Sequence, residues 1–325
     1  MSPRKLILRT ELALGDAVCF TAAVRELHCQ YPGEFITDVR TPFPQLWEHN
    51  PHLTPLADDE PDAESIACHY DKDAWFSVNQ SNQNPCHLLH AYCQDLANSL
   101  GLPSLHPAEL KGDIHLSRDE YGWKSMPHEK FNCQRYWVLS LGGGKRDFTT
   151  KWYLPEHVQK IVDYFRGRIQ FVQIGKENDN WHWQPDLHGV IDLRGQTDVR
   201  QLIRVIHASC GVLSGITSAM HLAAAVPLPT WQRRPRPCVV VAGGREPRTW
   251  YGYTTHRILE SVGTLPCCRE GGCWHARTLP LNDGADSDKR VCERVVNGHP
   301  KCMAAIRPES VILEIERYLD SQGIE

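Results

Sequence analysis

The sequence predicts an α/β protein built from two doubly wound, Rossmann-like domains that face each other across a cleft. Three observations lead to this prediction. Short apolar runs alternate with segments of helical periodicity, the alternation occurs twice, and the 325 residues suffice for two domains of ordinary size. Because parallel sheets bind ligands beyond the carboxyl ends of their strands, the cleft between the domains is the expected ligand site.

The first half of the chain begins with an apolar run at 5–9, which we expect to be a buried strand. A helical pattern follows over 17–33, where Tyr31-Pro32-Gly33 stops it. The other elements expected in this half are strands at 34–39, 64–70 and 113–117, a short helix within 43–53 and a helix at 87–103. Residues 117–135 are polar and aperiodic, and we interpret them as the linker.

The alternation restarts with a strand that runs into a glycine turn at 136–144. The later elements expected are strands at 169–175, 210–215 and 237–244, and helices at 154–167, 198–209, 218–226 and 307–319, with Pro155 and Pro308 near two of the helix starts. The pattern lapses between 262 and 306. We therefore expect an N-terminal domain at 1–130, a C-terminal domain at 131–306 that includes a cysteine-rich segment at 262–305, and a terminal helix at 307–325.

The composition is that of an ordinary soluble protein, with 41% hydrophobic and 23% charged residues. A formal net charge of −4 argues against a broad cationic face for nucleic acid or anionic lipid. The first 16 residues lack the apolar core of a signal peptide, and no run approaches the ~18 apolar residues of a spanning helix. We expect a cytoplasmic protein with mostly reduced cysteines.

The first candidate site is the strand-to-helix turn at Gly15 and Asp16. An aspartate at a helix start commonly acts as an N-cap that accepts hydrogen bonds from free N–H groups. The alternative is a carboxylate at the cleft mouth that takes a proton from an incoming hydroxyl.

The glycine turn is the second candidate, since consecutive glycines let the backbone approach a phosphate closely. The residues expected to contact a phosphate here are Gly143, Gly144, Lys145 and Lys151. The spacing differs from that of a Walker A loop. The alternative is a flexible turn with solvated charges.

The third candidate is the start of the helix at 218–226, because a helix N-terminus binds anions through its free N–H groups. His221 lies one turn inside; a lone histidine in an apolar helix is more often a core residue, but here it follows Thr217 and Ser218. The fourth candidate is Arg245 and Glu246, which directly follow a predicted strand. Charged residues at this position are expected to point into the ligand crevice. The alternative is that the two side chains pair with each other.

Five of the chain's 13 cysteines lie in the segment where the alternation lapses. Cys268, Cys273, Cys292 and Cys302 would supply four thiolates to a closed tetrahedral site for zinc or iron, with Cys267 as the alternative to Cys268. The segment between them has little apolar content, so a structural metal would order it. A disulfide pair and free thiols are the alternatives.

In this order the motifs resemble glycosyltransferase family nine, the ADP-heptosyltransferase family, over nearly the whole chain. The resemblance is carried by "GDAVCFTAAVRELHCQYPGEFITDV", Lys151-Trp152, "IGKEND", "VIDLRGQTDVRQLIRVIHAS" and "GITSAMHLAAAV". It implies a GT-B fold, with the donor nucleotide held mainly by the second domain. It also implies an inverting enzyme that transfers a sugar from ADP-heptose to an acceptor hydroxyl and needs no catalytic divalent metal.

The resemblance also implies roles for single residues. Asp16 matches the general base, Lys151 a diphosphate-binding lysine, and Glu177 an acidic residue near the nucleoside. The remaining donor-site residues expected are Gly175, Thr217, Ser218, Ala219, Met220 and His221. Ile216 departs from the family, which carries an aspartate there that is expected to hold sugar hydroxyls. A different sugar, or a different way of holding it, is therefore open.

The segment "CCREGGCW" resembles the autotransporter-type heptosyltransferases, a branch described as iron-binding and oligomeric, although the gap between its first two cysteines is longer here. The acceptor could be a protein hydroxyl, a lipopolysaccharide core or a small molecule. Two other classes remain open. One is a sugar-nucleotide-binding protein without transfer, which Ile216 favours, and the other is a GT-B epimerase or phosphorylase.

Overall fold

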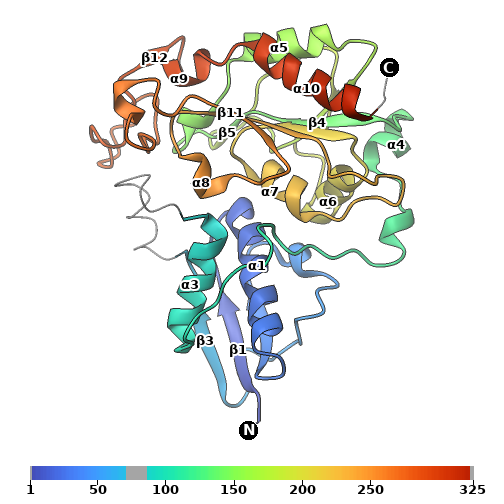
Figure 1. Ribbon diagram of the computed structural model, residues 1–325, viewed down its shortest axis with the longest axis vertical. Coiled ribbons are helices and arrows are strands. Elements are labelled where there is room, and N and C mark those ends of the chain that lie inside the picture. The colour runs from blue at the N-terminus through green and yellow to red at the C-terminus, as the bar shows by residue number, and fades with distance from the viewer. Residues whose placement is uncertain (1, 71–85, 323–325) are drawn as a thin grey trace.

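Two parallel sheets organise the chain in the computed structural model, which describes residues 2–70 and 86–322 (Figure 1). The smaller sheet has the strand order β2-β1-β3 and the larger one β11-β10-β9-β4-β6-β8. Figure 1 shows the smaller sheet with its helices below the larger sheet, so the chain forms two α/β units. No helix among the described residues is long and apolar enough to cross a membrane.

The first unit is centred on β1 (Arg4–Arg9), which pairs in parallel with β2 (Phe35–Arg40) and β3 (Ala63–Ala67). Leu6, Ile7 and Leu8 in β1 are buried, as expected for a central strand. Helices α1 (Leu14–Gln30) and α3 (Leu88–Leu100) pack against each other. A short helix, η1 (Pro44–Trp47), completes this unit, and the predicted elements at 5–9, 17–33, 34–39, 43–53, 64–70 and 87–103 are confirmed.

The second unit is a larger sheet with helices on both faces. Its strands are β4 (Tyr136–Ser140), β6 (Gln170–Gln173), β8 (Ile191–Asp192), β9 (Gly211–Ser214), β10 (Cys238–Gly243) and β11 (Arg257–Glu260). Its main helices are α4 (Met126–Phe131), α5 (Pro155–Tyr164), α6 (Val199–His207), α7 (Ser218–Ala225), α8 (Arg248–Tyr251) and α10 (Pro308–Gln322). The C-terminal helix α10 packs against α5 through Val311, Ile315 and Leu319, which are buried.

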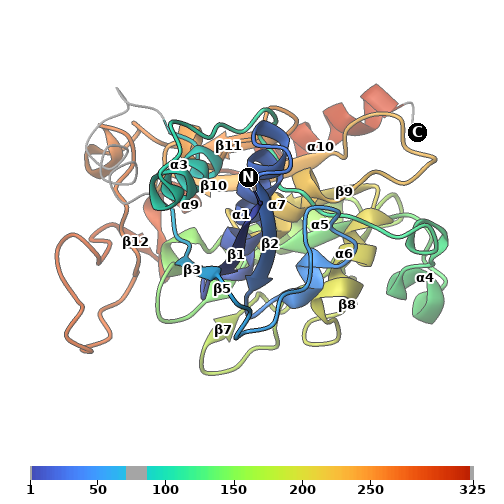
Figure 2. The same cartoon turned by 90° about the horizontal axis from the view of Figure 1, so that it is seen from below.

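The cysteine-rich segment has little regular structure. It contains η4 (Pro266–Cys268), β12 (Val295–Val296), β13 (His299–Pro300) and α9 (Lys301–Ala304). Figure 2 shows that it extends beyond the second sheet on the side opposite the C-terminal end. A two-stranded pairing of β5 (Gly143–Gly144) with β7 (His182–Trp183) and the short helices η2 (Glu120–Gly122) and η3 (Thr149–Lys151) complete the fold.

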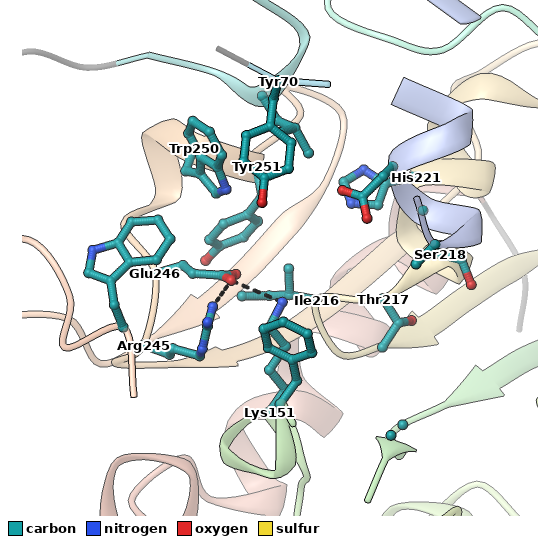
Figure 3. A pocket seen from close by; sticks show the side chains of 18 of the residues that line it. Tyr70, Lys151, Ile216, Thr217, Ser218, His221, Arg245, Glu246, Trp250 and Tyr251 are labelled. Atoms are coloured by element: carbon teal, nitrogen blue, oxygen red, sulfur yellow. Dashed lines mark hydrogen bonds and ion pairs between the residues drawn. The ribbon is translucent and has the colours of Figure 1, made fainter. Parts of the chain in front are cut away.

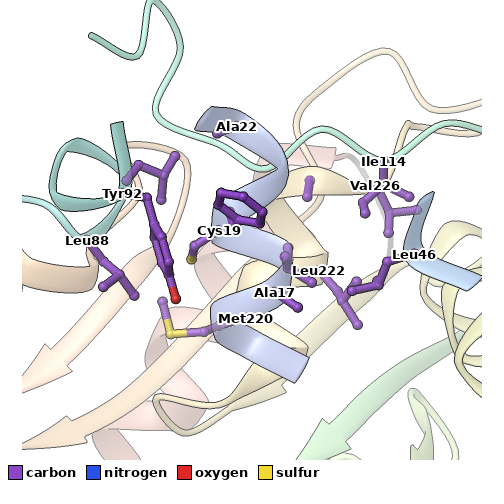
Figure 4. Close-up of a cluster of buried hydrophobic side chains, with 14 of the residues drawn as sticks. Ala17, Cys19, Ala22, Leu46, Leu88, Tyr92, Ile114, Met220, Leu222 and Val226 are labelled. Carbon is purple, nitrogen blue, oxygen red and sulfur yellow. The ribbon is translucent and has the colours of Figure 1, made fainter. Parts of the chain in front are cut away.

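The two units share one hydrophobic core where α1 packs against α7 (Figure 4). Ala17, Cys19, Met220 and Leu222 are fully buried there. The chain at Gly112 packs tightly on α1, because an added Cβ there would lie 2.6 Å from the carbonyl oxygen of Val18. The contact between the units is therefore a packed interior, and it fixes the starts of α1 and α7 beside each other.

The predicted strand at 113–117 is wrong, because side chains occupy its backbone groups. The amide of Asp113 donates to the Thr21 hydroxyl at 2.6 Å, and the carbonyl of His115 accepts from Arg200 at 2.7 Å. The expected linker at 117–135 contains η2 and α4 and is anchored by the buried ion pair of Glu120 with Arg200. The segment between the two sheets is therefore fixed to α6.

Candidate functional site

A cleft of about 360 Å³ lies between the two units, at the starts of α1 and α7 and beyond the carboxyl ends of β9 and β10 (Figure 3). Residues from both units line it, as parallel α/β folds lead one to expect. The cleft brings together ten of the residues predicted from the sequence, namely Gly15, Asp16, Gly143, Gly144, Lys151, Thr217, Ser218, His221, Arg245 and Glu246.

Two helix N-termini meet at this cleft. The two starts are in contact at Gly15, where an added Cβ would lie 3.3 Å from Cδ2 of His221, closer than most such contacts, and 3.4 Å from the Cα of Ser218. Neither N-cap residue of these two helices, Ala13 or Thr217, caps its helix with its own side chain; the Thr217 hydroxyl instead contacts the Ser214 hydroxyl at 2.9 Å. Free N–H groups at the start of α7 favour an anionic ligand, whereas the Asp16 carboxyl accepts backbone hydrogen bonds at the start of α1.

Asp16 lies in the first turn of α1, two residues inside the helix start at Leu14. The N-cap position of α1 is occupied by Ala13 and not by Asp16, although the Asp16 carboxyl does accept backbone hydrogen bonds at Ala13 and Asp16, as the N-cap interpretation expected. Burial raises the pKa of the Asp16 carboxyl above its ordinary value, and the positive charge of Lys151 partly opposes the shift. A carboxyl with a raised pKa in a cleft is suited to accept a proton.

Two cations share one carboxylate on the opposite wall of the cleft. The ammonium of Lys151 lies 2.9 Å from Oε1 of Glu246, and Arg245 forms an ion pair with the same oxygen (Figure 3). Burial lowers the pKa of Lys151 well below its ordinary value, and the charge of Arg245 adds to the shift. Burial also lowers the pKa of Arg245 to about 10. Both earlier alternatives hold for Arg245 and Glu246, which pair with each other and line the cleft.

His221 is buried beside α1 and also lines the cleft. Its Nδ1 contacts the Tyr253 hydroxyl at 2.6 Å and the Cys19 sulfur at 3.4 Å. Burial lowers the pKa of its imidazole to about 3, so the ring is neutral at physiological pH. A neutral ring held through Nδ1 is a positioning group or hydrogen-bond partner, and it does not add to the positive charge of the cleft.

An aromatic wall completes the cleft, and the sequence analysis missed it. Its members are Tyr70, Phe148, Trp250, Tyr251 and Trp274. Phe148 adopts a positive φ of 70° and places its ring 5.1 Å from the ammonium of Lys151 and 5.0 Å from the guanidinium of Arg245. The order "GREPRTWY" was the available indication, since it puts Trp250 and Tyr251 within five residues of the predicted crevice residue Glu246.

Five residues predicted to bind the donor do not line the cleft: Lys145, Gly175, Glu177, Ala219 and Met220. Lys145 is half-buried, and its ammonium donates to the carbonyl of Asp179. Glu177 is exposed, and its side chain packs over Gly195. Gly175 has a φ of 132° beside Gln184, while Ala219 and Met220 are buried in the shared core.

The five cysteines of the cysteine-rich segment line one small cavity of about 10 Å³. No disulfide joins any of these five described cysteines. Burial raises the pKa of the Cys273 thiol to about 12 and raises that of Cys302 as well. Within residues 2–70 and 86–322, three metal-ligating atoms come within 4.8 Å of one another only at Glu48, His49 and Glu120. The five cysteines thus line one cavity, but no three of their sulfur atoms lie within 4.8 Å of one another.

Comparison with known proteins shows which fold the chain shares. No protein-family model matches the sequence, and no curated protein matches it significantly. The glycosyltransferase family 9 structure from Veillonella parvula superposes with a TM-score of 0.64 at 13% identity, covering 98% of this chain and 97% of that one. The E. coli ADP-heptose LPS heptosyltransferase II superposes with a TM-score of 0.62 at 14% identity, covering 98% and 99%.

A third similar structure is TibC of enterotoxigenic E. coli, described as an iron-containing dodecameric glycosyltransferase. It has a TM-score of 0.63 at 12% identity, covering 99% of this chain and 78% of that one. TibC has also been solved with ADP-D-β-D-heptose. At these identities the likeness shows the fold. The mixed α/β architecture with two parallel sheets therefore matches that of GT-B heptosyltransferases, as the sequence motifs predict.

Proposed function

We propose that the protein is an inverting glycosyltransferase that transfers a sugar from a nucleotide diphosphate donor to an acceptor hydroxyl. The observation that carries the proposal is the cleft itself, where the Asp16 carboxyl from one unit meets Lys151 and Arg245 from the other. We assign acceptor binding to residues 1–130 and donor binding to residues 131–306, because the cations and the α7 start belong to the second range.

In this mechanism the Asp16 carboxylate removes the proton from the acceptor hydroxyl, whose oxygen then attacks the anomeric carbon of the donor. The bond between that carbon and the diphosphate oxygen breaks, and the configuration inverts. Negative charge develops on the leaving diphosphate. Lys151, Arg245 and the N–H groups at the start of α7 lie where they stabilise this charge, so the protein itself supplies the part that a divalent cation plays in other transferases.

We propose ADP-heptose as the donor, since heptosyltransferases share the fold and TibC binds ADP-D-β-D-heptose. A thermal-shift panel of ADP-heptose and of uridine and guanosine sugars tests this. ADP-heptose at about 100 times its Kd is expected to stabilise the protein by about 2.7 kcal/mol, seen as a rise in Tm. A rise with a uridine or guanosine sugar alone would replace the donor. No rise with any nucleotide sugar would contradict the proposed function.

Ile216 is the observation that favours a second candidate function. Its apolar side chain lines the cleft, so it offers a sugar no hydrogen bond. The alternatives are a sugar-nucleotide-binding protein without transfer, or a transferase with another donor that acts on lipopolysaccharide or a small molecule. A protein serine or threonine is the acceptor we propose to test first, because the cysteine-rich segment resembles that of the autotransporter-type branch. Assembly into a homo-oligomer and a cytoplasmic location belong to the same proposal.

We also propose a structural iron or zinc ion among Cys268, Cys273, Cys292 and Cys302, with Cys267 as the alternative to Cys268. Four thiols around one small cavity are a fitting donor set for either metal. The sulfur atoms would have to draw together to about 3.8 Å, the spacing of a tetrahedral Zn–S₄ site with bonds of about 2.3 Å. When bound, the ion would act as a cross-link between α9, η4 and the loops beside them.

Removal of the metal is expected to lower Tm by roughly 5–10 °C, because metal binding energy is folding energy and each 1 kcal/mol is worth about 2–4 °C in a large domain. The measurement is differential scanning calorimetry of protein as purified and after chelation, with metal analysis of both. Cys292→Ser should reproduce the loss, whereas Cys29→Ser, at an exposed position on α1, should not. The structural role fails if chelation leaves Tm and the oligomer unchanged while abolishing turnover.

A further inference from the structure

The cleft and the cysteine cavity are the two sides of one wall. Arg245 lines both of them. The neighbouring Gly244 packs so closely on the cysteines that an added Cβ would lie 3.0 Å from the Cys268 sulfur. The amide of Cys273 donates to the carbonyl of Gly244 at 3.2 Å, and the amide of Trp274 donates to that of Arg245 at 3.0 Å. The cysteine-rich segment thus runs along the back of the strand end that carries the cleft's arginine.

One carbonyl of this segment holds residues beside both cations. The His275 oxygen accepts from the Arg245 Nε at 2.8 Å and from the Thr150 hydroxyl at 2.6 Å. Thr150 is buried and directly precedes Lys151 in η3. The same carbonyl therefore ties the backbone next to the lysine to the guanidinium of the arginine.

Further contacts hold the cysteine-rich segment against the loop that leads to Lys151. The amide of Thr278 donates to the Thr149 hydroxyl at 2.9 Å, and Arg277 donates to the Asp147 carboxylate at 2.9 Å. These bonds fall on either side of Phe148, whose ring lies over both cations. The segment also contributes Trp274 to the cleft wall directly.

We propose that the cysteine-rich segment is a positioning element for the diphosphate site, with the His275 carbonyl setting the spacing of Lys151 and Arg245. This inference rests on the proposed function, because the diphosphate of the donor is the ligand that the two cations would hold. The spacing matters because a displacement of reacting or binding groups by about 1 Å costs up to about 100-fold in rate. The segment thereby acts on the reaction through Lys151 and Arg245, which lie outside it in the sequence.

Two glycines of the segment provide a matched test. An added Cβ on Gly272 would lie 2.4 Å from the carbonyl oxygen of Arg245, whereas one on Gly284 meets no atom within 4 Å in the described chain. Both glycines have a positive φ, 106° and 78° respectively, so either alanine carries backbone strain. Gly272→Ala alone pushes the segment away from Arg245. Thr150→Val removes one bond to His275, and Thr150→Ser keeps a hydroxyl there.

Calorimetric binding of ADP and of inorganic pyrophosphate to the full chain is the measurement. We expect Gly272→Ala and Thr150→Val to raise both Kd values about tenfold, and Gly284→Ala and Thr150→Ser to leave them within about twofold. Equal Kd values in the members of each pair would overturn the inference, and if Gly272→Ala fails to fold, the threonine pair decides. A wild-type protein that binds pyrophosphate but no nucleotide would overturn the proposed function alone, while one that binds neither would overturn both.

Discussion

Asp16→Asn is expected to lower the rate of sugar transfer about 10²–10⁴-fold while the protein still binds ADP with nearly unchanged affinity. The amide has nearly the same size as the carboxyl but cannot take the proton of the acceptor hydroxyl, and general base catalysis contributes a factor of this order. The loss should appear in kcat, since Asp16 lies on the unit opposite the two cations. Steady-state transfer assays and calorimetric ADP binding separate the two quantities.

The pH dependence of transfer provides a second test of Asp16 as the general base. Because burial raises the pKa of Asp16 above 3.8, kcat/KM should fall as the pH drops through this raised value, where the base becomes protonated. The acidic limb should be absent in Asp16→Asn. Asp58→Asn, at an exposed carboxylate of the first unit, is the control and should retain both rate and profile. Full transfer by Asp16→Asn would remove this residue from the mechanism; ADP-heptose binding without any transfer by the wild type would favour a binding protein.

Lys151→Met is expected to lower kcat/KM about 10²–10³-fold, the usual cost of losing one preorganised group that stabilises transition-state charge. The ammonium is mostly withdrawn from water, which makes its attraction for a developing phosphate charge stronger than at a surface. The fold should persist, because Glu246 keeps its ion pair with Arg245. Transfer kinetics and ADP affinity should therefore both decline while Tm changes little.

The control for Lys151→Met is Lys160→Met, which removes an exposed lysine from α5. It should leave kcat/KM within about twofold, since a surface charge away from the site is screened at physiological salt. Equal activity of the two variants would mean that Arg245 and the start of α7 suffice for the leaving group. A loss confined to KM would instead assign Lys151 to ground-state donor binding.

Much of the fold could be predicted because local patterns coincide with tertiary structure. Buried runs such as 5–9 became central strands, and Pro155 and Pro308 do begin α5 and α10. The misses have physical causes. The strand predicted at 113–117 does not form, because the Thr21 hydroxyl and the Arg200 guanidinium, both distant in sequence, hydrogen-bond to its backbone. Strand β11 was missed because it is a four-residue edge strand with a charged residue at each end.

The residues of the cleft that could be predicted lie at strand-to-helix turns, as Asp16 and Thr217 do, because such a turn can be recognised from the local sequence. The aromatic wall was not predicted, because Tyr70 and Trp274 are 204 positions apart (274 − 70) and no local pattern brings them together. Gly175 and Glu177 show that a sequence motif can predict where a residue lies without predicting where its side chain points. The motif places both residues just after β6. The Glu177 side chain packs over Gly195, however, and Gly175 lies beside Gln184, and no local pattern predicts these contacts.

The shared core between α1 and α7 also bears on how the chain is made. Cys19 and His221, which are in contact, are 202 positions apart. While the protein is being synthesised, the apolar face of α1 has to wait for α7 to leave the ribosome, at about 5–20 residues per second. Contacts of such separation form slowly. The nascent N-terminal unit is thus expected to spend roughly ten seconds or more with an uncovered hydrophobic helix, as a client for chaperones that bind exposed apolar segments.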